Sequence, residues 1–254
     1  MSGHAIMGRK RIFDLVICGA AAVLWVPAII ACGLVIWLVE GRPIFYISDR
    51  RVYGGRTIRV VKFRTMVRGA AKIANRSTIP IRRTRFLNMP HDSPLYTRLG
   101  RIIEACSLTE IPQLLHVIRG DMSLIGNRPL PEDEIRALAE VYPGVEDRFR
   151  TPAGLTGPVQ LIGRDVLTDY DRLAIESAYC GACLEGYSWR LDAAMLLLTV
   201  LIATRMRSRM SLEDVIGLIA RYRGSYRSIY LRDVKNGESH PGAIRPVHIR
   251  SESD

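Results

Sequence analysis

The longest uncharged stretch of the chain lies close to its N-terminus. Residues 15–39 are 25 consecutive residues without a charged side chain, and a helix needs roughly 20 apolar residues to cross the hydrocarbon core of a bilayer. A secretory signal peptide has a shorter apolar core, of about 7 to 15 residues, with small residues at a cleavage site after it. Glu40 and Arg42 follow this stretch instead. The pattern therefore predicts a helix embedded in a membrane.

Positive charge on both sides of this helix leaves its topology open. Arg9, Lys10 and Arg11 precede it, and five arginines follow between residues 42 and 59. Because basic residues mark cytoplasmic flanks, both ends have the character of a cytoplasmic side. Pro27, at the centre of the stretch, would remove a helix hydrogen bond and kink the chain there. A re-entrant hairpin and an ordinary kinked span with its more basic C-terminal side inside both agree with these charges.

The pattern then changes to one typical of strands. Residues 44–52 and 57–64 are rich in β-branched and aromatic side chains, with Gly54 and Gly55 between them. Such a pattern predicts a small β-hairpin with a tight turn. Residues 67–95 are basic and are interrupted by three prolines, so we expect a long, partly ordered loop there.

Helical periodicity follows this loop. Residues 99–106 have apolar side chains at the spacing of one helix face. A second helix is expected to begin at Ser107, which can form a capping box with Glu110, and to end at Gly120. Its buried stripe would consist of Ile111, Leu114, Leu115 and Ile118.

The chain after residue 130 predicts further helices separated by a loop. Residues 131–134 would begin a helix with acids in its first turn. Residues 151–164 contain several Gly and Pro and are expected to be a loop. Residues 169–205 are helical in pattern and end in an uncharged stretch that is too short to cross a membrane and is suited to lie against it or against the core. A short amphipathic helix is expected from Ser211, and the chain after Asp233 is expected to be disordered.

The net charge of the chain indicates the class of partner that the protein binds. The formal net charge is +11, and the excess is local, since residues 42–90 contain 13 basic residues and one acid. The segment predicts an anionic partner, which on composition alone is a phosphate-bearing substrate, an acidic lipid or a nucleic acid. The five cysteines are scattered and do not form a disulfide framework. Cys180 and Cys183 have C-x-x-C spacing without a second pair, which favours small residues on a helix over a metal or redox site.

An ordered set of motifs extends from about residue 9 to residue 205. The pieces are residues 11–14 (RIFD), 41–45 (GRPIF), 62–66 (KFRTM), 97–101 (TRLGR), 107–114 (SLTEIPQL), 119–130 (RGDMSLIGNRPL), 152–157 (PAGLTG), Gln160, residues 163–164 (GR) and residues 188–192 (SWRLD). Taken together, they resemble the bacterial sugar transferases known as small monotopic phosphoglycosyl transferases.

The resemblance implies a reaction. It implies transfer of a phosphosugar from a UDP-sugar to a polyprenyl (undecaprenyl) phosphate, with Mg²⁺ as cofactor and release of UMP. The enzyme would initiate synthesis of an exopolysaccharide or another glycan at the cytoplasmic face of the bacterial inner membrane. The implied partners are the UDP-sugar, the polyprenyl phosphate and membrane lipid, without nucleic acid, and a homo-oligomer is left open. The family's helix is re-entrant, which favours the hairpin topology.

The expected fold class is α+β. Residues 1–40 would form a membrane-embedded re-entrant helix hairpin. Residues 41–232 would form a cytoplasmic, mainly helical domain that carries the small β-hairpin and interfacial helices. Residues 233–254 would form a disordered tail.

The resemblance also implies the site residues. The family uses an Asp-Glu pair, in which the Asp attacks the β-phosphorus and the Glu and Mg²⁺ assist. Glu110 matches the Glu, as catalytic residue and metal ligand, and Thr109 stands at the position of the nucleophile. Four positions match as substrate-binding residues, Lys62, Arg128, Gln160 and Arg164.

Three residues depart from the family pattern. Thr109 replaces the nucleophilic Asp, Glu104 stands where an Arg is usual, and Asn127 replaces the Pro of a Gly-Pro-Arg-Pro loop. A Thr hydroxyl is a weak nucleophile unless a neighbouring base activates it. Glu110 is a candidate for that base or for a replacement nucleophile, and its capping box with Ser107 could explain a Glu there without any chemistry.

Two rival functions remain open at this point. The first is an impaired family member that binds nucleotide-sugar or lipid carrier and scaffolds or regulates an active partner, as the three departures indicate. The second is a membrane-anchored basic module that binds anionic lipid or nucleic acid through residues 42–90. The second gives no reason for the Gly- and Pro-bearing motifs after residue 97.

Overall fold

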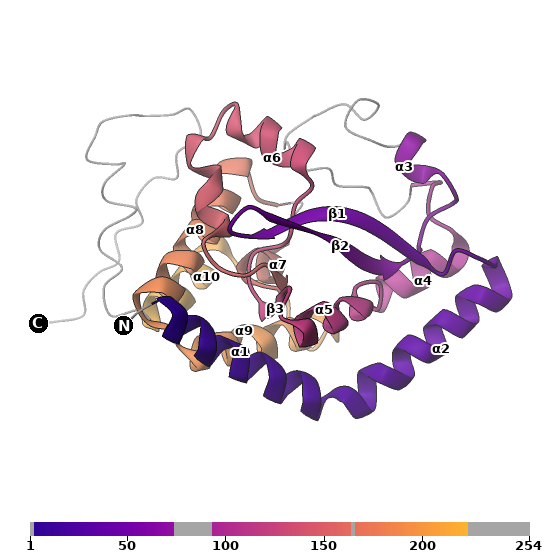
Figure 1. Cartoon of the computed structure of the whole chain (residues 1–254), viewed down its shortest axis with the longest axis horizontal. Helices are drawn as coiled ribbons and strands as arrows, with labels where there is room; N and C mark the ends of the chain where they lie inside the picture. Colours follow the sequence, from indigo (N-terminus) through magenta and orange to yellow (C-terminus); the bar gives the residue numbers. More distant parts are fainter. Residues whose placement is uncertain (1–2, 74–92, 164–165, 223–254) are drawn as a thin grey trace, which may run out of the picture.

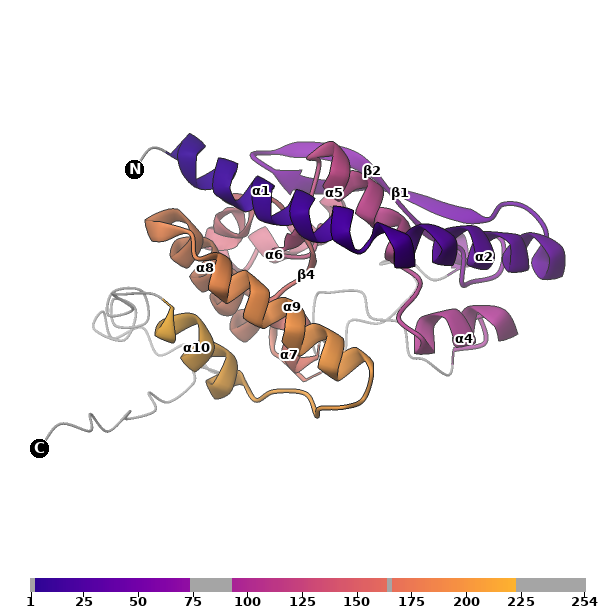
Figure 2. The ribbon, with the colours of Figure 1, turned by 90° about the horizontal axis from the view of Figure 1, so that it is seen from below.

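The computed structural model describes residues 3–73, 93–163 and 166–222. Within them, helices surround two small sheets, which confirms a mixed helix and sheet fold. In chain order the elements are α1 (Gly3–Ala20), α2 (Ala22–Glu40), β1 (Phe45–Tyr53), β2 (Arg56–Phe63), α3 (Ala70–Ile73), α4 (Arg98–Ala105), the 3-10 turn η1 (Ile111–Gln113), α5 (Leu114–Arg119), β3 (Ser123–Ile125), α6 (Glu132–Ala139), the 3-10 segment η2 (Pro143–Phe149), β4 (Gly154–Thr156), α7 (Pro158–Ile162), α8 (Asp169–Gly186), α9 (Trp189–Ala203) and α10 (Leu212–Arg221). Helices α1 and α2 run along one edge of the molecule, α8 and α9 lie beside α1, and α10 lies on the far side of them from α1 (Figures 1 and 2).

The N-terminal helix pair bends at Ala21, not at the predicted Pro27. Ala21 lies in the turn between α1 and α2, whereas Pro27 lies inside α2. The indole N–H of Trp25 donates to the carbonyl of Cys18 across the bend, at 2.9 Å. This bond satisfies a carbonyl that the interrupted helix would otherwise leave without a partner, so the side chain of Trp25 stabilises the break at this point.

Helix α2 has the character of a membrane segment. Among the described helices it is the one long and apolar enough to cross a membrane, judged by length and composition, and most of its residues are not buried in the protein. Its surface includes the exposed side chains of Val23, Leu24, Ile30 and Leu38. A re-entrant course and a cytoplasmic location of the remaining chain stay predictions.

Polar side chains of α1 dock this helix onto the later part of the chain. Lys10, 1% exposed, donates to Asp192 Oδ2 at 2.6 Å and to the Tyr179 hydroxyl at 3.1 Å. Asp14 accepts from the Ser123 hydroxyl and from the Leu124 N–H, each at 3.0 Å. Lys10 was counted above among the basic residues that flank the apolar stretch. In the structure its charge is buried in an ion pair with Asp192. The division of the chain at residue 40 stays a prediction, and α1 is packed against the body beyond it.

The predicted β-hairpin is confirmed. Strands β1 and β2 pair antiparallel, with Phe45 opposite Phe63 and Arg50 opposite Ile58. Gly54 and Gly55 connect them, both with positive φ, which is the conformation that a two-residue hairpin turn needs. This hairpin carries the basic residues that follow α2.

The expected loop at residues 151–164 contains two elements in the described part. Strand β4 pairs parallel with β3, with Ser123 opposite Gly154, and helix α7 follows. A Cβ at Gly154 would lie 2.0 Å from the Gly126 nitrogen, and one at Gly157 would lie 2.2 Å from the Gly126 oxygen. The glycines of two separate motifs thus allow the backbones to touch, and sequence periodicity does not report such a contact.

The helix expected from Ser107 begins later and in another register. Ser107 has φ +58°, and the first helical residues belong to η1, with α5 after it. No capping box joins Ser107 and Glu110; a capping box occurs instead between Ser211 and Asp214 at the start of α10. Because the 3-10 turn shifts the register, His116 and Val117 are buried whereas Leu115 and Ile118 are exposed, contrary to the predicted stripe.

The other helix predictions agree with the structure. Gly120 ends α5 in the left-handed conformation. Helix α6 follows Pro131, α4 matches residues 99–106 closely, and residues 169–205 form α8 and α9 with a break at residues 187–188. The tail from residue 233 and most of the predicted basic loop lie outside the described residues.

Candidate active site

Backbone contacts bring the motif around Thr109 beside the end of β2. The Phe63 N–H donates to the carbonyl of Thr109 at 2.9 Å, so the loop before η1 is fixed next to the strand that carries Lys62. Arg128 follows β3 and pairs with Glu110. Four of the predicted site residues, Lys62, Thr109, Glu110 and Arg128, therefore lie in one cluster.

Three cations surround a small pocket in this cluster. Its lining residues are Ser48, Arg50, Val60, Lys62, Gln113, Arg128 and Pro129. Ser48 and Arg50 lie two residues apart on β1, and Val60 and Lys62 lie two residues apart on β2, so that each pair points to the same face of the hairpin. Sequence reasoning missed Arg50, although this spacing of two in a predicted strand was a usable signal.

Two of the pocket cations, Lys62 and Arg50, lie in surroundings that disfavour their charged forms. Burial, and then the positive charge of Arg128, lower the pKa of Lys62. Burial also lowers the pKa of Arg50, although Glu134 opposes the shift. Like charges that converge around one pocket favour an anionic ligand, because a phosphate group would relieve their repulsion.

Glu110 forms a bidentate ion pair with Arg128. Arg128 Nη1 donates to Glu110 Oε2 at 2.8 Å, and Arg128 Nη2 donates to Glu110 Oε1. Burial would lower the pKa of Arg128, but the charge and hydrogen bonds of Glu110, together with the charges of Glu104 and Glu134, raise this pKa above its ordinary value. Both carboxylate oxygens of Glu110 are thus engaged by one guanidinium group.

Thr109 is paired with Glu104 and not with Glu110. Its hydroxyl donates to Glu104 Oε2 at 2.6 Å, and the residue is 5% exposed. The hypothesis that Glu110 activates Thr109 as a base is therefore corrected: Glu104 is the carboxylate at the hydroxyl, and Glu110 is bound to Arg128.

The carboxylate of Glu110 is a suitable ligand for a divalent cation. Mg²⁺ is often bound by one or two carboxylates together with substrate phosphates, and Glu110 supplies one carboxylate beside the pocket cation Arg128. No group of three or more metal-ligating side chains occurs among the described residues. The donor set thus fits Mg²⁺ that arrives with a diphosphate, and it does not form a closed metal cage.

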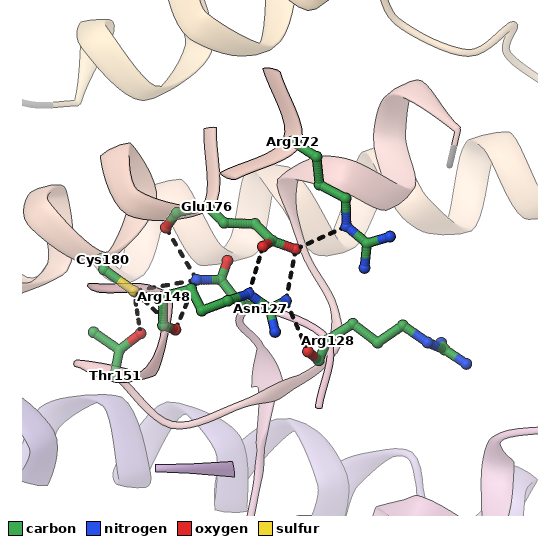
Figure 3. A network of polar contacts seen from close by, with 7 residues as sticks. All are labelled: Asn127, Arg128, Arg148, Thr151, Arg172, Glu176 and Cys180. Atoms are coloured by element: carbon green, nitrogen blue, oxygen red, sulfur yellow. Dashed lines mark hydrogen bonds and ion pairs between the residues drawn. The ribbon is translucent and has the colours of Figure 1, made fainter. Parts of the chain in front are cut away.

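A buried network of ion pairs and hydrogen bonds holds the backbone of the loop that contains Arg128 (Figure 3). Arg148 donates through Nε to Glu176 Oε2 at 2.6 Å and through Nη2 to the carbonyl of Arg128 at 3.0 Å. Arg172 donates to the same Glu176 at 3.2 Å. Although burial would raise the pKa of Glu176, Arg148 and then Arg172 hold it below its ordinary value. The i,i+4 spacing of Arg172 and Glu176 was the one sequence signal for this network.

The departure at Asn127 belongs to this network and not to the pocket. Its Nδ2 donates to the carbonyls of Arg148 and Glu176, each at 3.0 Å, and to the Cys180 sulfur at 3.2 Å. Thr151 also contacts that sulfur, at 3.0 Å. Asn127 therefore ties the loop to η2 and α8, and Cys180 is a buried packing residue on a helix, as the sequence favoured.

Two predicted substrate-binding residues are not joined to this cluster by the described contacts. Gln160 lies on α7 and is absent from the pocket lining, and its Nε2 is buried without a hydrogen-bond partner among the described residues. Arg164 lies outside the described residues. A binding role for both stays a prediction.

Part of the basic segment is neutralised within the chain. Arg51 binds Glu132 and Glu146, each at 2.7 Å, and Arg64 contacts Glu40 at 3.3 Å. The described part of residues 42–90 is therefore not a uniform cationic surface, which counts against a general polyanion-binding module.

Comparison with known proteins agrees with the placement of these motifs. The family model described as Bacterial sugar transferase matches residues 5–206. Exopolysaccharide production protein ExoY of Sinorhizobium fredii is 30% identical over 196 residues, 75% of this chain and 83% of that protein. Undecaprenyl-phosphate galactose phosphotransferase of Salmonella typhimurium is 32% identical over 207 residues, 77% of this chain and 40% of that protein. UDP-glucose:undecaprenyl-phosphate glucose-1-phosphate transferase of Caulobacter vibrioides is 32% identical over 157 residues, 61% of this chain and 54% of that protein. Since the family model matches well over half of its residues, the chain belongs to the bacterial sugar transferase family.

Proposed function

We propose that the protein transfers a phosphosugar from a UDP-sugar to undecaprenyl phosphate and so initiates synthesis of an exopolysaccharide or a related glycan. The observation that carries this proposal is the pocket in which Arg50, Lys62 and Arg128 converge, with the carboxylate of Glu110 on Arg128. The names of two relatives support the substrate classes: the Caulobacter vibrioides enzyme is named for a UDP-sugar donor, and it and the Salmonella typhimurium enzyme are both named for undecaprenyl phosphate.

The pocket residues would act on the diphosphate of the donor. Lys62 and Arg50 neutralise phosphate oxygens, and Arg128 has a guanidinium group that can exchange its two bonds from Glu110 to a phosphate. Glu110 is then available to a cation, and Mg²⁺, when bound, would supply charge neutralisation at the leaving phosphate. The network of Arg148 and Glu176 holds the Arg128 backbone in place during this exchange.

A re-entrant N-terminal hairpin at the cytoplasmic face of the inner membrane agrees with the contacts at both of its ends. At one end Lys10 is bound to Asp192. At the other end Arg64 donates to the carbonyl of Gly41 at 3.1 Å. A straight span would separate the two ends by the roughly 30 Å of a hydrocarbon core, whereas here both ends are attached to the same body. The hairpin would place the pocket near a membrane-borne acceptor.

Cysteine labelling tests this topology. Arg9 in the first half of α1 and Arg42 just after α2 are both exposed, and each is replaced by cysteine in a chain whose exposed Cys106 is serine. In inside-out vesicles a membrane-impermeant maleimide is expected to label both positions, and in right-side-out vesicles neither. Labelling of the two positions from opposite sides would establish an ordinary span.

Release of UMP tests the reaction. The detergent-solubilised protein is incubated with polyprenyl phosphate, Mg²⁺ and a panel of UDP-sugars, and UMP is measured. Lys62→Gln is expected to raise the KM for the donor about 10- to 100-fold, the cost of a lost hydrogen bond to a charged group. Arg59→Gln is the matched control, because Arg59 lies on the same strand with an exposed side chain. An equal effect of both variants would count against a phosphate site at Lys62.

In a second candidate function, the protein binds its substrates but does not transfer the phosphosugar. Its basis is the buried hydroxyl of Thr109 at the position where the family has a carboxylate. In that case the protein would bind a UDP-sugar or polyprenyl phosphate, with Kd values sensitive to Lys62 and Arg128, and release no UMP with any sugar of the panel. The same two measurements, binding and UMP release, therefore separate an enzyme from a scaffold.

A further inference from the structure

Two of the residues that depart from the family pattern contact each other. Glu104 lies in the last turn of α4, and Thr109 lies five residues later in the loop before η1. The Thr109 hydroxyl donates to Glu104 Oε2 at 2.6 Å, while the Thr109 carbonyl accepts from Phe63. A buried donor that is fixed through its own backbone thus orients a carboxylate that is itself half-buried.

The charge of Glu104 acts on the pocket. Burial and Arg128 lower the pKa of Lys62, and both Glu110 and Glu104 oppose that shift. Burial also disfavours the charge of Arg128, and its pKa is raised by Glu110 first and by Glu104 as well. Glu104 is therefore a second carboxylate of the same electrostatic cluster, and its partner is a neutral hydroxyl and not a guanidinium group.

The chemistry of phosphoryl groups decides between the two side chains of this pair. Attack by the Thr109 oxygen on a diphosphate would leave a phosphodiester, which has a lower transfer potential than the diphosphate that must be made in the next step. Attack by a carboxylate leaves a mixed carboxylic-phosphoric anhydride, whose transfer potential is high enough to pass the group on. A hydroxyl nucleophile would therefore leave the phosphosugar in an intermediate too stable to be passed on, whereas a carboxylate would leave it in an intermediate from which transfer is favourable.

We propose that Glu104 is the nucleophile of the transfer and that Thr109 is the positioning residue that orients it; the proposal rests on the function proposed above. A Glu104 oxygen forms a bond to the β-phosphorus of the UDP-sugar, the bond to the bridging oxygen breaks, and UMP leaves with that electron pair. An oxygen of polyprenyl phosphate then attacks the same phosphorus, and the electron pair of the broken anhydride bond returns to the Glu104 carboxylate. No oxidant, reductant or further reactant is needed.

Glu110 is less suited to this attack. Both of its oxygens accept hydrogen bonds from Arg128, and when the donor diphosphate takes up that guanidinium group, the released Glu110 carboxylate is the cation ligand in the function proposed above. Glu104 has its hydroxyl donor on Oε2, and that donor lowers the cost of holding the side chain in one orientation.

Trapping of the adduct tests the proposal. The full-length protein in detergent, with Mg²⁺, is mixed with a UDP-sugar that supports UMP release, without polyprenyl phosphate, and is quenched and mapped by mass spectrometry. We expect a phosphosugar adduct on Glu104 that hydroxylamine removes, because acyl phosphates react with hydroxylamine and phosphodiesters do not. A hydroxylamine-stable adduct on Thr109, or an adduct on Glu110, would overturn the assignment.

Isotope exchange gives a second readout that does not need the adduct to accumulate. Labelled UMP should enter the UDP-sugar in the absence of acceptor, since the first half-reaction is reversible. Turnover in the presence of acceptor without such exchange would mean a single displacement and would overturn the proposal. Absence of turnover by the unmodified protein with every donor would instead reject the proposed function itself.

Variants separate the nucleophile from its positioning residue. Glu104→Gln should lose at least 1,000-fold in kcat and all exchange, whereas Thr109→Val should lose about 10- to 100-fold in kcat with little change in donor KM. Thr109→Ser keeps the donor oxygen and should recover most of that loss. Glu140→Gln is the matched control because Glu140 is an exposed carboxylate at the end of α6. Thermal unfolding of each variant verifies folding, and a folded Glu104→Gln variant with full turnover would contradict the assignment.

Discussion

Thr109 and Glu104 are joined by a hydrogen bond of 2.6 Å from the hydroxyl of one to the carboxylate of the other. Each of the two residues differs in charge from the residue expected at its position in the family, a hydroxyl for a carboxylate and a carboxylate for an arginine. Because they touch, the effect of a change at one position depends on the residue at the other. An aspartate at 109 would face Glu104 with a second negative charge, whereas an arginine at 104 would face a hydroxyl that can accept a hydrogen bond but offers no opposite charge.

This contact predicts that the two positions are coupled. Thr109→Asp alone should destabilise the fold and should not raise turnover, because it places two carboxylates within hydrogen-bond distance. The double variant Thr109→Asp with Glu104→Arg should recover both, with a coupling energy of about 1–3 kcal/mol. Thermal unfolding and UMP release of the four members of the cycle measure this, and additive effects would show that the positions are independent.

Lys62 predicts a pH dependence of donor binding. Its pKa is lowered by burial and by Arg128, so its charge is lost at a lower pH than for an ordinary lysine. The affinity for the UDP-sugar should fall on the alkaline side before pH reaches the ordinary lysine value. Fold stability should rise over the same interval, because the unfolded chain there binds more protons than the folded one. Lys62→Arg should move the loss of affinity to higher pH; an unchanged profile would remove Lys62 from the phosphate site.

The buried network of Arg148, Arg172 and Glu176 predicts that a single substitution of similar size causes a large loss of stability. Glu176→Gln should cost about 3–5 kcal/mol, because it removes the carboxylate that pairs with the buried charges of Arg148 and Arg172. Asp147→Asn, which removes the exposed partner of Arg150, should cost less than about 1 kcal/mol. Chemical denaturation of both variants provides the comparison. Since the pKa of Glu176 lies below its ordinary value, its stabilising contribution is present above the unfolded pKa and is lost as pH falls through the folded one.

The ion pair of Lys10 predicts that α1 is part of the folded body. Lys10→Met should lower the free energy of unfolding by about 3–5 kcal/mol, because Asp192 would be left buried without its cation. Arg9→Met is the control, since Arg9 is the exposed neighbour on the same helix. If the two variants were equally stable, docking of α1 through Lys10 would contribute nothing to the fold.

Local patterns account for the features that sequence reasoning predicted correctly. The uncharged stretch of α2, the Gly54-Gly55 turn and the end of α5 at Gly120 each depend on residues that are neighbours in the chain. The family resemblance likewise located Lys62, Thr109, Glu110 and Arg128, because ordered motifs can be read without coordinates. These features follow from length, periodicity and local backbone preference, which are properties of the sequence itself.

The partners of those residues were decided by tertiary structure. The left-handed conformation of Ser107 redirects the chain after α4, and in the loop that follows Thr109 meets Glu104 while Glu110 meets Arg128. The contact of Gly126 with Gly154 and the burial of Lys10 against Asp192 join residues far apart in the chain. Such contacts depend on how loops set the relative positions of elements, and on which buried charge finds a partner, and neither is encoded in the spacing of residues along one segment. The sequence determined the elements and the kinds of groups in the site, and the packing of distant segments determined which carboxylate belongs to the hydroxyl and which to the arginine.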